Sequence, residues 1–197
     1  MSRIHMLKIV RLFLAILLTL QLSSVFASDE ITERRISIGL SLFRTLLASD
    51  RQINQKVNLD NQLNILLVSN GDPEELRHIS DKLANIGRGT KKGKIHGIPI
   101  KISKINIENL PHIEFSEIAG IYIADQLLEQ QLEVIINLGI SQHVLVFSPF
   151  EGDVEQGVSA GLAVGIRVLP YINLKALEEA QVTIKTLILK VAKIYED

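Results

Sequence analysis

Residues 62–86, QLNILLVSNGDPEELRHISDKLANI, contain the signals for a strand, a turn and a helix in immediate succession. The short apolar run Gln62–Ser69 predicts a strand, which Asn70-Gly71-Asp72 closes. Pro73 then opens a helical pattern, with Asp72 placed to cap it and acidic residues in its first turn. Because a strand that leads directly into a helix is the repeating unit of α/β proteins, this stretch predicts the fold class.

The same alternation of strands and helices continues toward the C-terminus. The predicted elements are, in order, a glycine-rich basic loop (Gly87–Gly97), an extended segment (Ile98–Ile107), a buried strand (Ile118–Ala124), a helix (Gln126–Leu138) and the start of a further strand (His143–Phe147). Asp125 is placed to cap the helix and Gly139 to end it. These repeated units favour a mainly parallel sheet covered on both faces.

Three further patterns complete the prediction. They are an amphipathic N-terminal helix (Ile31–Gln55), extended segments that pair near Gly165 (Ser159–Val168 and Tyr171–Asn173) and a C-terminal helix (Leu174–Tyr195). Pro170 lacks an N–H, which predicts an edge strand or a bulge at that point. The predicted fold is therefore α/β: a single three-layer domain with a mainly parallel sheet flanked by helices and an antiparallel edge near the C-terminus.

The N-terminus has the features of a cleavable export signal over residues 1–27. Basic residues precede a short apolar run, Leu12–Leu22, and Val25 and Ala27 supply the small side chains read at a cleavage site. An uncleaved anchor fits this length and these flanks less well. We therefore expect a periplasmic mature domain, residues 28–197, that touches a membrane only peripherally.

The composition of that mature domain argues against two classes of function, nucleic-acid binding and cysteine chemistry. It carries 18 basic and 22 acidic residues, a formal charge of −4, which is not the balance of a nucleic-acid-binding protein. The chain has no cysteine, so thiolate nucleophiles, disulfides and cysteine metal sites are excluded.

Candidate catalytic residues are few. Gly157-Val158-Ser159-Ala160-Gly161 matches the nucleophile-elbow pattern, but no histidine follows Ser159 and the next residues read as a strand, so a structural role is favoured. Glu151 and Asp153 follow a strand and are either an acid/base pair or, as we prefer, an acidic turn.

Metal and phosphate sites are not predicted either. The histidines of the mature chain, His78, His96, His112 and His143, do not show ligand spacing, and His112 with Glu114 is the nearest to a pair. The basic cluster, Arg88, Lys91, Lys92 and Lys94, lacks the order of a phosphate loop. It reads as a solvated loop, with docking to an acidic partner or to anionic headgroups as the alternative.

The C-terminal third resembles the YfiR family of small periplasmic proteins, of the YfiR/HmsC type. The matching pieces are Val146-Phe147-Ser148, Glu151-Gly152, Gly157, Arg167-Val168 and Ile172-Asn173-Leu174. Gly120-Ile121-Tyr122-Ile123 is similar to a buried strand of that family, and the helix from Ile31 to its N-terminal helix. The chain departs from the pattern at Pro170 and Tyr171, where the family has Phe and Glu, and it lacks the cysteines that many members carry.

This resemblance implies a periplasmic α/β protein without enzymatic activity or cofactor. It implies that the chain binds the periplasmic part of an inner-membrane diguanylate cyclase and represses it, which would affect cyclic-di-GMP signalling and biofilm formation. A binding surface would be apolar with a polar rim, for which Leu127, Leu128, Leu169, Tyr171 and the basic loop are candidates. The alternatives are a small-solute-binding protein, with its site near Ser69–Gly71 and Ser148–Asp153, and a sensor partner of a membrane histidine kinase. A homodimer is compatible with each.

Overall fold

The computed structural model describes residues 32–112 and 117–196, with side chains up to residue 110 in the first range. The predicted signal peptide, residues 1–27, lies outside these ranges. Contacts divide the chain between Arg35 and Ile36, and the unit from Ile36 onward contains the whole sheet. Within the described residues, no helix is both long and apolar enough to span a membrane.

The described residues form an eight-stranded sheet in the order β2-β3-β1-β4-β5-β6-β7-β8. The strands are β1 (Leu63–Ser69), β2 (Lys94–Ile95), β3 (Ile98–Asn106), β4 (Ile118–Ile123), β5 (Leu145–Phe147), β6 (Ala160–Val164), β7 (Val168–Asn173) and β8 (Lys193–Tyr195). The pairs β2–β3 and β6–β7 are antiparallel and the others are parallel. The predicted α/β class, with a mainly parallel sheet and an antiparallel pair near the C-terminus, is confirmed.

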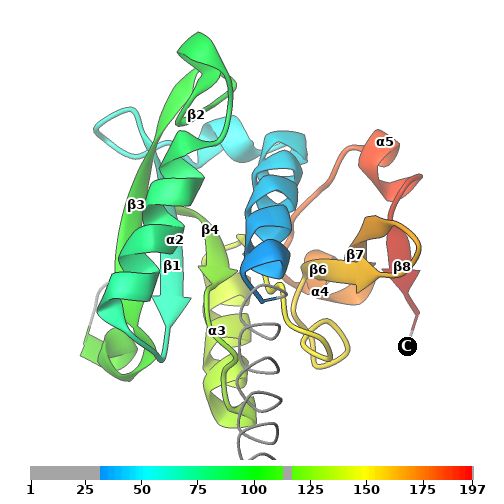
Figure 1. Ribbon diagram of the computed structural model, residues 1–197. Coiled ribbons are helices and arrows are strands. Elements are labelled where there is room, and N and C mark those ends of the chain that lie inside the picture. The colour runs from blue at the N-terminus through cyan, green and yellow to red at the C-terminus, as the bar shows by residue number, and fades with distance from the viewer. Residues whose placement is uncertain (1–31, 113–116, 197) are drawn as a thin grey trace, which may run out of the picture. The chain divides into compact units, whose positions relative to one another are not determined.

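Helices cover both faces of this sheet (Figure 1). The helical segments of the described chain are the N-terminal helix (residues 32–49), η1 (Ile53–Gln55), α2 (Pro73–Asn85), η2 (Gly89–Lys91), η3 (Ile107–His112), α3 (Glu129–Ser141), α4 (Leu174–Glu179) and α5 (Thr186–Leu189). The N-terminal helix and α2 share one apolar cluster, to which β1 contributes Ile65 and Leu67. Helix α3 belongs to the other cluster, with Leu66 and Val68 of the same strand. Alternate residues of β1 therefore face opposite layers, as in a buried parallel strand.

The N-terminal helix packs closely on the centre of the sheet. A Cβ on Gly120 of β4 would lie 2.6 Å from Leu47 Cδ2, so the missing side chain admits the helix. Phe43 of the helix meets Tyr122 of β4 and Phe147 of β5, with ring centroids 5.5 Å and 5.8 Å away. The Tyr122 hydroxyl donates a hydrogen bond to Ile36 O at 3.2 Å, and burial raises the pKa of this phenol well above its ordinary value.

The first strand and helix form as the sequence predicts. Strand β1 spans Leu63–Ser69 and α2 begins at Pro73. The Asp72 side chain accepts a hydrogen bond from Glu74 N at 2.9 Å, which confirms its capping role.

The prediction that Asp125 caps the next helix is wrong. Helix α3 begins later, at Glu129, and ends at Ser141 rather than at Gly139. The backbone N–H of Leu128 donates to Gln131 Oε1 at 3.0 Å. Asp125 instead accepts a hydrogen bond from Ser69, at the end of the neighbouring strand β1. Its carboxylate, which the sequence pattern predicts as a helix cap, therefore makes a contact with a residue distant in sequence.

The long C-terminal helix predicted over Leu174–Tyr195 is also wrong. Helix α4 ends at Glu179, and Gln181 follows with φ of +55°. Thr183 O accepts from Arg51 N at 2.9 Å, and Lys185 N donates to Ser49 O at 2.9 Å. These contacts with the end of the N-terminal helix hold the chain extended, after which short α5 and strand β8 complete it.

Pro170 does not lie in an edge strand, because β8 follows β7 in the sheet. Its partner in β6 is Leu162, whereas the pairing of β7 with β8 covers only Tyr171–Asn173. The imide nitrogen thus falls outside the stretch that β8 pairs with, which is how the proline is tolerated next to a parallel strand.

Candidate functional site

The best-formed candidate site lies where the strand order reverses direction. From β1 the chain passes through α2 to β3 on one side, and then returns to β4 on the other side of β1. Loops that follow neighbouring strands on either side of such a point diverge, and in open α/β sheets ligands bind in the crevice they leave. The carboxyl ends of β1 and β4 therefore lie where a ligand crevice is expected.

A serine and an aspartate connect these two strand ends. Ser69, the last residue of β1, donates from Oγ to Asp125 Oδ2 at 2.5 Å, and its Oγ accepts from Gly71 N at 2.9 Å. A Cβ on Gly71 would lie 2.5 Å from Asp125 Oδ2, so only glycine leaves the carboxylate in place. Ser69 is buried, while Asp125 is half-buried. We call this arrangement the Ser69–Asp125 pair.

A pocket of about 250 Å³ lies beside the Ser69–Asp125 pair. Its lining comes from the end of β1, the start of α2 and the end of β3, and consists of Ser69, Gly71, Pro73, Leu76, Arg77, Lys104 and Asn106. Arg77 and Lys104 are both exposed at its rim, and Arg77 is 3.2 Å from Glu74. With two cations and a helix N-terminus around it, the pocket suits a small anion or the carboxylate of a zwitterion.

A second serine and aspartate lie at the carboxyl end of β5. Ser148 Oγ donates to Asp153 Oδ2 and accepts from Phe150 N at 3.1 Å. Both side chains are buried. Burial raises the pKa of the Asp153 carboxyl, the hydrogen bond from Ser148 opposes that change, and the charge of Glu155 adds to it. We call this arrangement the Ser148–Asp153 pair; it closes the turn that follows β5.

The two carboxylates proposed from sequence as an acid/base pair lie in different environments. Asp153 is buried, whereas Glu151 is exposed in the turn. The structure therefore gives them different roles, with Asp153 holding the turn and Glu151 facing solvent.

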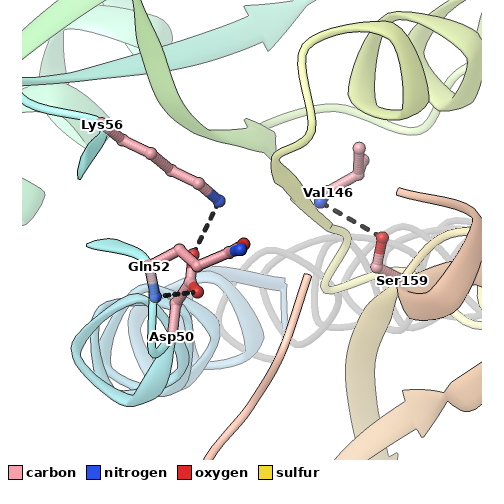
Figure 2. Close-up of polar contacts among 5 residues, drawn as sticks. All are labelled: Asp50, Gln52, Lys56, Val146 and Ser159. Atoms are coloured by element: carbon pink, nitrogen blue, oxygen red, sulfur yellow. Dashed lines mark hydrogen bonds and ion pairs between the residues drawn. The ribbon is translucent and has the colours of Figure 1, made fainter. Parts of the chain in front are cut away.

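Ser159 does not lie on a strand-to-helix elbow. It precedes strand β6, is buried, and its Oγ accepts from Val146 N at 3.4 Å (Figure 2). Gly157 before it has a φ of +112°, which explains a glycine at this position. The glycine-rich pattern here serves the bend into β6.

The histidines considered from the sequence as metal ligands lie in different elements. His78 lies in α2, His143 in the turn after α3, and His96 in the β2–β3 turn, where Nε2 is 2.7 Å from Ala48 O. His112 ends η3, and its side chain and Glu114 lie outside the described residues. In the part of the chain that the structure describes, no three metal-ligating side chains of these types gather.

The apolar candidates for a binding surface divide into two groups. Leu127 and Tyr171 are buried, so neither offers a free surface. Leu128 and Leu169 are exposed, at 69% and 38%. The β6–β7 turn also exposes large apolar side chains, with Val164 at 61% and Ile166 at 107%; sequence patterning did not single out these two residues.

Sequence analysis also missed a buried ion pair. Asp50, which directly follows the N-terminal helix, lies 2.6 Å from Lys56 Nζ and accepts from Gln52 N at 2.9 Å (Figure 2). The Asp50 side chain has no exposed surface. The pair spans η1, which lies between its two residues, and its only sequence signal is an acid six residues before a lysine.

Comparisons with known proteins show similarity of fold and do not assign the chain to a family. No family model matches the chain, and no curated protein matches it. A solved structure of the ABC domain from Streptococcus pneumonia in complex with L-Trp is similar, with a TM-score of 0.52 and 11% identity over 76% of this chain. A conserved domain protein from Vibrio cholerae has a TM-score of 0.48 and 18% identity over 73% of this chain.

The chain spans 62% of the length of the first of these proteins and 60% of the second. At such identities the likeness concerns the fold alone.

Proposed function

We propose that this protein is an exported regulatory protein that acts by binding and has no catalytic role. Its expected partner is the periplasmic part of an inner-membrane signalling protein, a diguanylate cyclase, which it represses. Cyclic-di-GMP signalling and biofilm formation would be the processes affected. The proposal rests on the resemblance of the C-terminal third to the YfiR family and on one structural observation.

That observation is the exposed apolar turn between β6 and β7. Val164, Ile166 and Leu169 present large apolar side chains to water within a few residues of one another. A monomer gains nothing from such exposure, and large apolar side chains held in water are a common feature of protein-binding sites. The turn lies within residues 146–174, the same stretch that carries the resemblance.

The serine side chains near the ends of β1 and β5 and before β6 are compatible with a binding role. The hydroxyls of Ser69, Ser148 and Ser159 all make internal hydrogen bonds. These hydrogen bonds support a structural role for the three serines, which are the side chains that a nucleophilic mechanism would use.

The test is deletion of the gene followed by measurement of cellular cyclic-di-GMP. We expect a rise that the full-length gene reverses and a version starting at residue 28 does not, because export is needed to reach the partner. Ile166→Asp should fail to reverse the rise. Leu59→Asp is the matched control, since Leu59 is 92% exposed in a different turn, and it should reverse the rise fully. An unchanged cyclic-di-GMP level on deletion would remove the proposed role.

A second candidate function, binding of a small solute, is favoured by the pocket beside the Ser69–Asp125 pair. The similar fold of the ABC domain was solved in complex with L-Trp, and the pocket's Arg77 and Lys104 suit a carboxylate. A solute bound here would also suit a sensor partner of a membrane histidine kinase.

This second function is tested by calorimetric titration with amino acids and small carboxylic acids. Arg77→Gln should weaken binding of any ligand found, while Arg51→Gln, an exposed arginine elsewhere, should not. A ligand that binds both variants as it binds the unaltered protein would place the solute outside this pocket.

A further inference from the structure

Positive charge in this chain is concentrated in one segment. Lys82 to Ile107 contains seven basic residues and no acidic residue. The rest of the chain beyond residue 27 contains 11 basic and 22 acidic residues. The molecule therefore carries a local charge of +7 against −11 elsewhere, although its formal charge is small.

The segment forms one edge of the sheet. Strands β2 and β3 are its outermost pair, and their hairpin lies at the top of Figure 1, beyond the end of the N-terminal helix. Arg88, Lys91 and Lys92 are exposed at the start of this hairpin, and Lys101 and Lys104 are exposed along β3. These five cations make no ion pair within 4.0 Å to any residue that the structure describes. We call the exposed surface of residues 87–104 the basic hairpin.

The basic hairpin is open at its turns. A Cβ placed on Gly89 or on Gly97 would meet no atom within 4 Å. An open surface with cations on long side chains matches a broad, diffuse negative surface better than the shaped groove that a specific acidic peptide needs.

The backbone of the hairpin is anchored to the core. Arg44 of the N-terminal helix donates from Nη2 to Lys91 O at 3.2 Å and to Lys94 O at 2.5 Å. His96 Nε2 lies 2.7 Å from Ala48 O of the same helix. These hydrogen bonds go to main-chain carbonyls and leave the exposed lysine ammonium groups in solvent. They therefore hold the backbone of the hairpin in place while its positive charges stay free to contact a partner.

We propose that the basic hairpin docks this protein on a membrane surface rich in anionic phospholipid headgroups. The headgroup phosphates take the exposed cations, and the negative remainder of the molecule is repelled, which orients the hairpin edge toward the bilayer. The inference depends on charge placement alone and does not require the proposed regulatory function.

The test is co-sedimentation of the exported, purified protein with lipid vesicles. We expect binding to vesicles in which about a third of the lipid is phosphatidylglycerol, no binding to pure phosphatidylcholine vesicles, and loss of binding at about 500 mM salt. Replacing Arg88, Lys91 and Lys92 together by Gln should weaken binding about a hundredfold.

The matched control replaces Arg51, Arg167 and Lys190 by Gln, three exposed cations outside the segment. It changes the net charge equally and should weaken binding less than about threefold. Equal losses in both triple variants would overturn the proposal, because net charge would then explain the binding. Failure of the unaltered protein to bind anionic vesicles at about 50 mM salt would also overturn it and would leave an acidic protein as the occupant to test. Neither outcome bears on cyclic-di-GMP repression.

Discussion

The carboxyl ends of β1 and β5 carry the same small arrangement of side chains in two different settings. In each, a serine hydroxyl donates to an aspartate and accepts from the backbone N–H two residues later. Asp125 reaches Ser69 from 56 residues away and is half-buried, beside a pocket. Asp153 is five residues from Ser148 and is buried.

Burial and chain separation distinguish the roles of the two pairs. The Ser148–Asp153 pair locks a local turn, because its carboxylate has almost no access to water. The Ser69–Asp125 pair joins two strands at the switch point and faces a space where a ligand fits. The four variants below separate these roles.

The largest effect is expected from Ser148→Ala. The change leaves the buried Asp153 carboxylate without its hydroxyl donor, which should lower the free energy of unfolding by about 2–3 kcal/mol. Ser141→Ala, whose hydroxyl bonds Leu138 O at an exposed position, is the control and should cost less than about 0.5 kcal/mol. Denaturant unfolding measures both. Equal costs would mean that burial of the Ser148–Asp153 pair contributes nothing.

Gly71→Ala tests the close approach at the Ser69–Asp125 pair. The new Cβ would lie 2.5 Å from Asp125 Oδ2, so the carboxylate must move away from Ser69. We expect a loss of about 1–2 kcal/mol in unfolding free energy. Gly165→Ala is the matched control, because the nearest atom to its Cβ is 3.9 Å away. A Gly71→Ala protein as stable as the control would show that the carboxylate is not held in place.

Ser69→Ala should cost about 1 kcal/mol, less than Ser148→Ala, because the half-buried Asp125 can bind water in place of the hydroxyl. Ser103→Ala, which removes a hydroxyl bonded to Asn64 Oδ1 at 2.8 Å, is a control from the neighbouring strand β3. If Ser69→Ala proves as costly as Ser148→Ala, the contrast between an open and a closed pair fails.

The smallest effect is expected from Asp153→Asn, and its size depends on pH. The folded-state pKa of Asp153 lies above its ordinary value of 3.8, so the folded protein binds the proton more tightly than the unfolded chain does. The stability of the unaltered protein should therefore fall as pH rises through the range above 3.8.

The amide introduced by Asp153→Asn would still accept from Ser148, but the variant would lose this pH dependence. Unfolding of the variant should thus require more denaturant than the unaltered protein at about pH 7, with the difference shrinking toward about pH 4. Stability curves that run parallel across this range would contradict the assigned burial of the Asp153 charge.

Local pattern predicted β1, β3, β4 and the first capped helix because those signals act between neighbours, but it missed β2 and β8. The Asp72 side chain accepts from Glu74 N, two residues away, and the apolar residues of β1 alternate between the two layers because of the strand period. The Asp125 prediction failed because a capping residue and a tertiary acceptor have the same sequence signature. Of the two serine–aspartate pairs, only Ser148–Asp153 lies within one turn. Even there the sequence indicated an acidic turn but not the hydrogen bond between the two side chains.

The main alternation of strands and helices, the charge of each segment and the absence of cysteine follow from the sequence alone. Those properties depend on residue identity and on contacts within a few positions along the chain. Contacts formed on folding bring Ser69 to Asp125, and they extend residues 182–185 along the end of the N-terminal helix instead of continuing α4. In both cases the bonding partner lies far away in sequence, so no local preference can specify it.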